Sequence, residues 1–292
     1  MNIDKTNFFN ELTAIVILYR STNLVLKLIK QLTNIKILVV DNGGNEKILK
    51  EIKEYDNIQI ISKKKNLGHG RGANYAFQFI KTKYFIILSP DVIIDEENIL
   101  KLLLNIRKFD NCAIIAPVTK DDKDYYGIFP EKGKGIIRNK IEEICSKNLE
   151  GKSLSGIVCV DVVKGCTMLV NSELFKKIGM FNEKYFLFWE EIDLCRKVRK
   201  NKLSVIIDNN SSASHASGFS SKNDYLTFFI KSYHYELSPL IYFDVKKNAY
   251  ILYWRLVKYI FRTLTYLISL NFKNSVKNFA KFSATLSYII KV

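Results

Sequence analysis

The stretch Ser89-Pro90-Asp91 places one carboxylate at the end of an apolar run, Tyr84-Phe85-Ile86-Ile87-Leu88. A short apolar run bounded by turn residues is typical of a buried strand. A carboxylate at such an end either closes a turn or provides an oxygen ligand for a hard cation such as Mg²⁺ or Mn²⁺. This stretch alone leaves both interpretations open.

A glycine-rich loop, Asn66-Leu67-Gly68-His69-Gly70-Arg71-Gly72-Ala73-Asn74, lies between a strand pattern and a helix pattern. Its glycines let backbone N–H groups and the N-terminus of the helix approach an anion. The loop matches neither the G-x-G-x-x-G dinucleotide fingerprint nor the P-loop. Taken alone, it is consistent with an anion site and with an ordinary strand-to-helix turn.

Three acids, Glu190, Glu191 and Asp193, crowd the start of a helix predicted from about residue 189 to 201. A structural role explains them, because acids there favour the helix dipole and Asp193 stands i,i+4 to Lys197. The residues just before them, Phe186-Leu187-Phe188-Trp189, are apolar. A carboxylate at an apolar edge can be tuned as a general base, so a catalytic role is the alternative.

Short apolar runs alternate with helix patterns through the first part of the chain. Strands are predicted at 13–19, 35–41, 57–62 and 84–88, with helix patterns between them. This alternation is typical of an α/β fold with a mainly parallel sheet and helices on both faces. Ligands bind beyond the carboxyl ends of such strands. Asp41 and Asp91 stand at such ends, and His215 follows a later predicted strand.

The character of the chain changes twice after these strands. Residues 119–156 are charged and punctuated by glycine, and we predict an excursion over the sheet there. From about residue 225 the chain is aromatic and basic, and residues 245–292 hold nine Lys or Arg and no acid. We therefore predict an α/β domain at 1–220 and a helical extension at 221–292.

The basic extension contains a long apolar segment at 248–270 that three cations interrupt. Each cation would cost about 2.5–3.5 kcal/mol at the centre of a bilayer, so we do not expect a spanning helix. A helix lying in the interface of an anionic membrane fits the composition. A helical appendage that packs its aromatics on the main domain explains it equally well. Nucleic acid is less supported, because no base-reading motif accompanies the charge.

The overall composition is that of a folded, basic protein of 292 residues, of which 48% are hydrophobic. Intrinsic disorder is excluded by this content. A net charge of +16 indicates a polyanionic partner such as nucleic acid, anionic lipid or a phosphorylated substrate. Five cysteines without a CxxC pair are typical of reduced cytosolic thiols. The N-terminus lacks signal-peptide features, so we expect the protein on the cytoplasmic side.

The order of these motifs resembles that of family 2 glycosyltransferases with the GT-A fold. The matching elements are a strand with Tyr-x-Ser at its end, then "VVDN", "NLGHGRGAN", "SPD", "GCTML", "FLFWEEIDLCRK" and a late histidine. The resemblance covers roughly residues 11–220 and is closest to the rhamnosyltransferase-like branch that builds bacterial surface polysaccharides. It implies a GT-A nucleotide-sugar-binding domain.

The resemblance also implies roles for individual residues. The donor, a dTDP- or UDP-linked sugar, would be bound by Tyr19, Ser21, Asp41, Asn66, Gly68, Arg71, Asn74 and Ser89. Mn²⁺ or Mg²⁺ would be held by Asp91, at the family's DxD-type position, and by His215. Glu191 stands where the family has its catalytic base, usually an Asp. The sugar or acceptor side would be formed by Gly165, Cys166, Trp189, Glu190 and Asp193.

The implied function is an inverting, metal-dependent transfer of a sugar to a hydroxyl of a glycan or lipid-linked glycan. The enzyme would serve synthesis of a surface polysaccharide, such as lipopolysaccharide or capsule. It would act peripherally on the inner face of the cytoplasmic membrane, without nucleic acid.

Two alternatives remain beside this implied function. The first is a sugar nucleotidyltransferase, which is disfavoured because the glycine loop follows the third strand, not the first. The second is a non-catalytic α/β module that binds nucleic acid or anionic lipid, with the acids only capping helices.

Overall fold

The computed structural model describes residues 8–63, 65–119, 129–130, 156–216, 218–222 and 224–291. The chain divides into two compact units. Among the described residues, the first unit comprises everything up to Glu183 together with Glu190–Ser221, and the second comprises Lys184–Trp189 and the chain from Lys222 on. The predicted excursion at 119–156 lies almost entirely outside the described residues.

A mixed β-sheet forms the centre of the first unit. Its strands are β1 (Leu12–Leu18), β2 (Lys36–Asp41), β3 (Ile58–Ser62), β4 (Tyr84–Leu88), β5 (Val92–Ile93), β6 (Cys112–Thr119), β7 (Ile157–Val160), β8 (Thr167–Asn171) and β9 (Ser204–His215). The order across the sheet is β3-β2-β1-β4-β8-β6-β9-β5, and β7 also pairs with β9.

Most strands run in the same direction, as predicted. The exceptions are β8, which enters antiparallel between β4 and β6, and the strands β5 and β7, which pair antiparallel with β9. The strands from β3 to β4 are all parallel, which confirms the predicted mainly parallel sheet. The antiparallel entry of β8 was not predicted, since its apolar pattern carries no information on direction.

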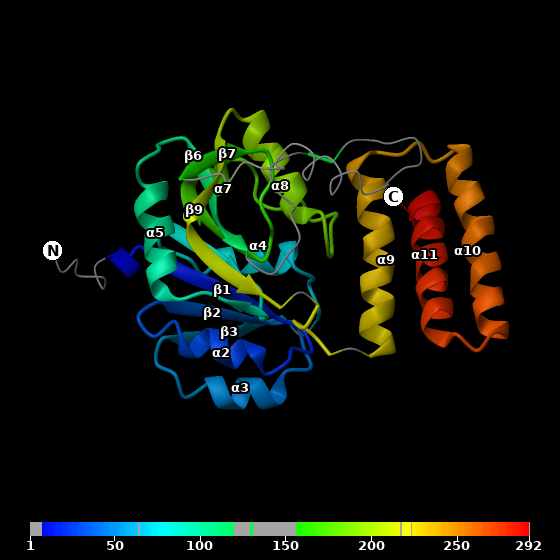
Figure 1. Cartoon of the computed structure of the whole chain (residues 1–292), viewed down its shortest axis with the longest axis horizontal. Helices are drawn as coiled ribbons and strands as arrows, with labels where there is room; N and C mark the ends of the chain where they lie inside the picture. The colour runs from blue at the N-terminus through cyan, green and yellow to red at the C-terminus, as the bar shows by residue number, and fades with distance from the viewer. Residues whose placement is uncertain are drawn as a thin grey trace. The chain divides into compact units, whose positions relative to one another are not determined.

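Helices cover both faces of this sheet (Figure 1). They are α2 (Leu24–Lys30), α3 (Glu46–Ile52), α4 (Gly70–Phe77), α5 (Glu96–Ile106), α7 (Ser172–Lys177) and α8 (Glu190–Lys200). All of β1 is buried, and its side chains alternate between the faces. Ala14 and Val16 join the core that includes α2 and α5, and Ile15 and Ile17 join the core that includes α4 and α8. The predicted α/β class is confirmed.

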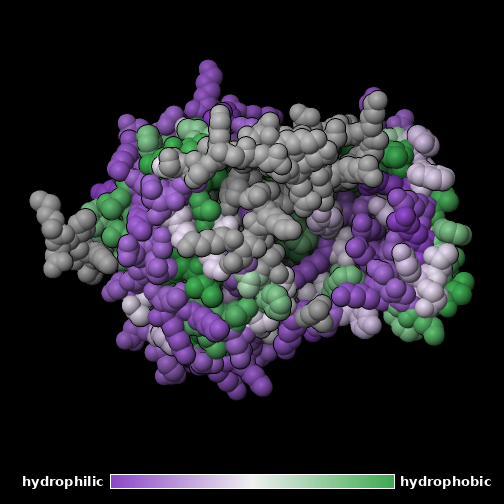
Figure 2. All heavy atoms as spheres, viewed as in Figure 1, coloured by the Kyte–Doolittle hydropathy of each residue, from purple (hydrophilic) through white to green (hydrophobic). Residues whose placement is uncertain are grey.

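The second unit contains the helices α9 (Tyr225–Tyr242), α10 (Tyr250–Ile268) and α11 (Phe272–Lys291). Glu236 of α9 is buried between them. Its carboxylate pairs with Arg255 and accepts a hydrogen bond from Tyr259 Oη (3.0 Å), and Lys281 Nζ of α11 lies 3.9 Å away. A buried carboxylate needs such partners, and this cluster joins residues of all three helices. Figure 2 shows hydrophobic residues along the right-hand edge, where α10 lies.

Candidate active site

The carboxyl ends of the parallel strands meet at one edge of the first unit. In the register of the sheet, Leu18 of β1 stands beside Asp41 of β2. β8 runs antiparallel to β4 and pairs Thr167 with Leu88, so the loop before β8 reaches the same edge. This edge therefore gathers the loops on which most of the predicted site residues lie.

Asp41 is held by a hydrogen-bond network in the turn after β2. Its Oδ1 accepts from the Gly43 N–H (2.9 Å) and from Asn45 Nδ2 (2.6 Å). The buried Asn45 also accepts from the Ser21 N–H (2.8 Å), and Ser21 Oγ accepts from the Tyr19 N–H (3.2 Å). Asn45 thus brings together three predicted nucleotide-binding residues, Tyr19, Ser21 and Asp41.

The glycine-rich loop is anchored to the same turn. Asn42, the residue after Asp41, accepts from the Leu67 N–H (3.1 Å) and donates to the Gly68 carbonyl (3.0 Å). Asn66 Oδ1 accepts from the Gly68 N–H (2.9 Å). Gly68 has a φ of +78°, in the left-handed region that favours glycine. Asn66 and Gly68 therefore lie close to Asp41, as a common ligand would require.

Arg71 and Asn74 of α4 contact the segment that ends at Glu183. Arg71 Nε donates to the Glu183 carbonyl (2.6 Å). The amide of the buried Asn74 makes two hydrogen bonds with the backbone of Phe181, one in each direction and both 3.0 Å long. Asn74 thus positions this segment, and a contact between Asn74 and a nucleotide stays a prediction.

Asp91 lies buried at the same edge, next to His215. The pairing of β5 with β9 sets Val92 opposite His215, and His215 Nε2 is 3.4 Å from Asp91 Oδ1. Neither carboxylate oxygen of Asp91 has a hydrogen-bond partner among the described residues. A buried carboxylate without a hydrogen-bond donor is costly, and carboxylate oxygens suit Mn²⁺ or Mg²⁺, beside which imidazole can serve as a nitrogen ligand. The two residues therefore fit the predicted metal.

In the described part of the chain, no group of three or more His, Cys, Asp or Glu side chains could hold a metal ion.

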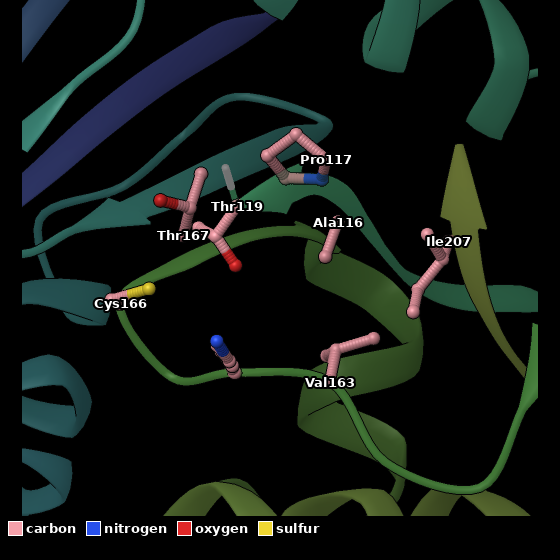
Figure 3. Close-up of a pocket in the computed structure, with 8 residues that line it drawn as sticks. Ala116, Pro117, Thr119, Val163, Cys166, Thr167 and Ile207 are labelled. Carbon is pink, nitrogen blue, oxygen red and sulfur yellow. The ribbon is translucent and has the colours of Figure 1, made fainter. Parts of the chain in front are cut away.

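The loop before β8 is hydrogen-bonded to the residue that follows β4. It also borders a narrow pocket. The Ser89 N–H donates to the Cys166 carbonyl (2.8 Å). This pocket is lined by Ala116, Pro117, Thr119, Val163, Lys164, Cys166, Thr167 and Ile207 (Figure 3). Cys166 is buried and not disulfide-bonded, and its predicted contact with the sugar or acceptor stays a prediction.

Glu190 and Glu191 begin α8 in different surroundings. Glu190 is buried, and its Oε1 lies 2.9 Å from Nδ1 of His69 in the glycine-rich loop. Glu191 packs against Gly165, where an added Cβ would stand 3.2 Å from Glu191 Cβ. Gly70 is equally close to Glu190, at 3.2 Å. The two glycines thus let the loops approach the carboxylates directly.

The three titratable groups at this point influence one another. Burial and the charge of Glu190 raise the pKa of Glu191 to about 8, while the charge of His69 acts in the opposite direction. Burial lowers the pKa of His69, but the hydrogen bond and charge of Glu190 and the charge of Glu191 outweigh it, so this pKa is raised. A carboxylate whose pKa is near the working pH is suited to general base catalysis.

His69 was missed as a site residue by the sequence analysis. The available signal was its position in the glycine-rich loop, in a chain with only three histidines.

Asp193 and Trp189 make contacts that were not predicted. The buried Asp193 has its Oδ1 2.6 Å from Arg196 Nη2, so Arg196 is its hydrogen-bonded partner where the sequence suggested Lys197. Trp189 has a φ of +70° and belongs to the second unit, where its ring packs on Tyr242 with a centroid distance of 5.1 Å. Contacts of both residues with an acceptor stay predictions.

The fold of the chain is that of GT-A glycosyltransferases. The crystal structure of GalNAc-T7 with UDP, GalNAc and Mn²⁺ superposes with a TM-score of 0.56 at 13% identity, covering 78% of this chain and 50% of that one. The mannosyltransferase PcManGT from Pyrobaculum calidifontis, in complex with GDP-Man and Mn²⁺, superposes with a TM-score of 0.55 at 10% identity, covering 96% and 87%.

The chain belongs to glycosyl transferase family 2, whose model matches residues 8–173. The low-salt glycan biosynthesis hexosyltransferase Agl10 of Haloferax volcanii is 25% identical over 67% of this chain and 64% of its own length. The rhamnosyltransferase WbbL of Escherichia coli is 24% identical over 73% of this chain and 83% of its own. An uncharacterized glycosyltransferase of Rickettsia typhi, RT0329, is 29% identical over 61% and 56%. The chain thus spans less than two thirds of two of these relatives, and the predicted family is confirmed.

Proposed function

We propose that the protein is an inverting, metal-dependent glycosyltransferase that uses a dTDP- or UDP-linked sugar. The acceptor is a hydroxyl of a glycan or lipid-linked glycan in the synthesis of a surface polysaccharide. The observation that carries this proposal is the buried carboxylate of Asp91, which lacks hydrogen-bond donors among the described residues and lies beside His215. The names of Agl10 and WbbL support a hexosyl or deoxyhexosyl group as the transferred sugar.

The donor site lies at the carboxyl edge of β1, β2 and β4. Asp41, with Tyr19 and Ser21 beside it, contacts the nucleoside, and Asn66 and Gly68 line the nucleotide. Arg71 and Ser89 border the diphosphate. Asp91 and His215 would hold the metal ion. When bound, Mn²⁺ or Mg²⁺ neutralises charge on the departing nucleoside diphosphate.

Glu191 is the general base of the proposed reaction. It takes the proton from the acceptor hydroxyl as that hydroxyl attacks the anomeric carbon, which inverts the configuration. Gly165 packs against the stem of Glu191 and so fixes the position of its carboxyl group. Position matters, because an error of about 1 Å can lower the rate of such a step a hundredfold.

The proposed location is the inner face of the cytoplasmic membrane, where the protein is peripheral. Residues 245–292 hold nine Lys or Arg and no acid, which favours contact with anionic lipid headgroups. No helix in the described ranges is both long and apolar enough to cross a membrane. A lipid-linked acceptor would be reached at such a surface.

Nucleotide binding tests the proposed donor site directly. We expect Mn²⁺ together with UDP or dTDP to raise the Tm of the purified protein, since a ligand of the folded state stabilises it by mass action. GDP and CMP are the matched controls and should have smaller effects. The absence of a shift with every nucleotide would count against the proposal and favour a non-catalytic binding module.

His69 and Glu190 should shift the pH profile of transfer in opposite directions. His69→Gln removes the cation that favours ionised Glu191, so the acidic limb of the kcat profile should move to higher pH. Glu190→Gln removes the carboxylate that opposes ionisation, so this limb should move to lower pH. The kcat of both variants would be measured from about pH 5 to about pH 10, a range that includes the usual pKa of a histidine and the raised pKa of Glu191. Shifts of the same sign would contradict the proposed coupling.

A further inference from the structure

An apolar face runs along the exposed side of α10. Its residues recur with helical i, i+3, i+4 and i+7 spacing, and all are exposed: Tyr250, Tyr253, Trp254, Val257, Ile260, Phe261, Leu264, Leu267 and Ile268. A helix of this size is about 28 Å long, at 1.5 Å per residue. An exposed apolar surface of that extent indicates a binding surface, because monomeric proteins seldom expose one to water.

The other two faces of α10 have different surroundings. Leu252 and Tyr259 are buried, and Arg255 and Tyr259 bind Glu236 of α9, so one face is committed to the helical unit. Lys258 and Arg262 are exposed and lie at one border of the apolar face. The helix therefore has a packed face, an apolar face and a basic face.

We propose that the apolar face of α10 inserts into the headgroup region of an anionic membrane, with the helix lying parallel to the surface. Interfacial helices have an apolar face with Trp, Phe and Leu beside a basic face, as seen here. This inference rests on the proposed membrane location, but it requires no catalytic residue. It assigns the contact to one helix face of the second unit.

Charge favours a lipid surface over a second copy of the chain as the occupant. Two α10 faces brought together would also bring their Lys258 and Arg262 side chains near each other. Residues 245–292 offer no acid to balance these charges. Anionic headgroups supply that balance, and they accept Lys and Arg at the border of an inserted apolar face. Figure 2 shows hydrophobic and hydrophilic residues mixed along the right-hand edge, where α10 lies.

Vesicle binding by the full chain tests the proposal. The wild-type protein should cosediment with vesicles of phosphatidylcholine and phosphatidylglycerol in equal parts, and less with phosphatidylcholine alone. Phe261→Glu, at a residue 66% exposed, should weaken this binding at least about tenfold, because a charge replaces an inserted ring. Phe219→Glu is the matched control, since Phe219 is 63% exposed but lies in the first unit, and it should bind as the wild type does.

Tryptophan fluorescence provides a second readout, because the chain has only two tryptophans. The vesicle-induced blue shift should persist in Trp189→Phe and disappear in Trp254→Phe. The proposal would be overturned if the folded wild type did not bind anionic vesicles, or if Phe261→Glu bound them as strongly as the wild type does. Self-association of the wild type that Phe261→Glu abolishes would also overturn it, since a second copy would then cover the face. The manganese-dependent Tm shift with nucleotide, measured in Phe261→Glu, reports separately on the donor site.

Discussion

Replacing Asp91 by Asn is expected to lower kcat by about a thousandfold while the protein stays folded. The proposed metal contributes several kcal/mol of charge stabilisation in the transition state, and about 1.4 kcal/mol corresponds to a factor of ten in rate. Folding should not suffer, because the carboxylate is buried without a hydrogen-bond donor among the described residues. A neutral amide costs less to bury than a carboxylate, which offsets the weaker contact with His215 at 3.4 Å, so Tm in the absence of metal should be about unchanged.

The control for this result is Asp95→Asn, the same substitution at an aspartate outside the proposed metal site. Asp95 caps α5 by accepting from the Asn98 N–H (2.8 Å), and asparagine caps helices about equally well. This variant should keep both the rate and the manganese-dependent Tm shift, whereas Asp91→Asn should lose both. His215→Gln should weaken the response to manganese without abolishing it. If Asp91→Asn transferred sugar at the wild-type rate, Asp91 would be a turn residue and the proposed metal site would be lost.

Several features of the site could be predicted because they depend on local patterns. An apolar run followed by a polar residue locates the end of a strand, and parallel strands align their carboxyl ends. Asp41 and Asp91 were placed at strand ends on this basis, and the structure has them there. The glycine loop was predicted between a strand and a helix, and Gly68 indeed adopts a positive φ. Periodicity and turn chemistry were sufficient for these features.

Other features depend on contacts between segments that no local pattern joins. The pairing of His69 with Glu190 requires that α4 and α8 begin side by side, which follows from the packing of both helices on one face of the sheet. The amide of Asn74 is engaged by the backbone of Phe181, 107 residues away. Trp189 belongs to the second unit, although its position in the sequence lies within the predicted α/β domain at 1–220. Such contacts are set by tertiary packing, so the sequence predicted the residue types but not their partners.

Replacing Glu191 by Gln is expected to lower kcat by about 10²- to 10⁴-fold, the usual contribution of a general base. The amide has nearly the shape of the carboxyl group, so its packing against Gly165 should be preserved. Binding of UDP or dTDP with manganese should be unchanged, because no donor contact is lost. The pH dependence should also change. The wild-type kcat should rise with pH with a midpoint at about 8, where Glu191 is half ionised, and this limb should be absent from Glu191→Gln.

Two further variants separate catalysis from helix capping at this position. Glu191→Asp keeps a carboxylate, with the side chain shortened by one methylene, and should retain much more activity than Glu191→Gln. Glu173→Gln removes a comparable first-turn acid from α7 and should leave kcat unchanged, because a helix-dipole effect alone contributes less than about 1 kcal/mol at an exposed position. If Glu191→Gln merely lowered Tm, as a lost first-turn acid would, another group would have to accept the proton. The nearest titratable candidates would then be His69 and Glu190. Loss of the acidic limb of the kcat profile in His69→Gln or in Glu190→Gln would identify which of them accepts the proton.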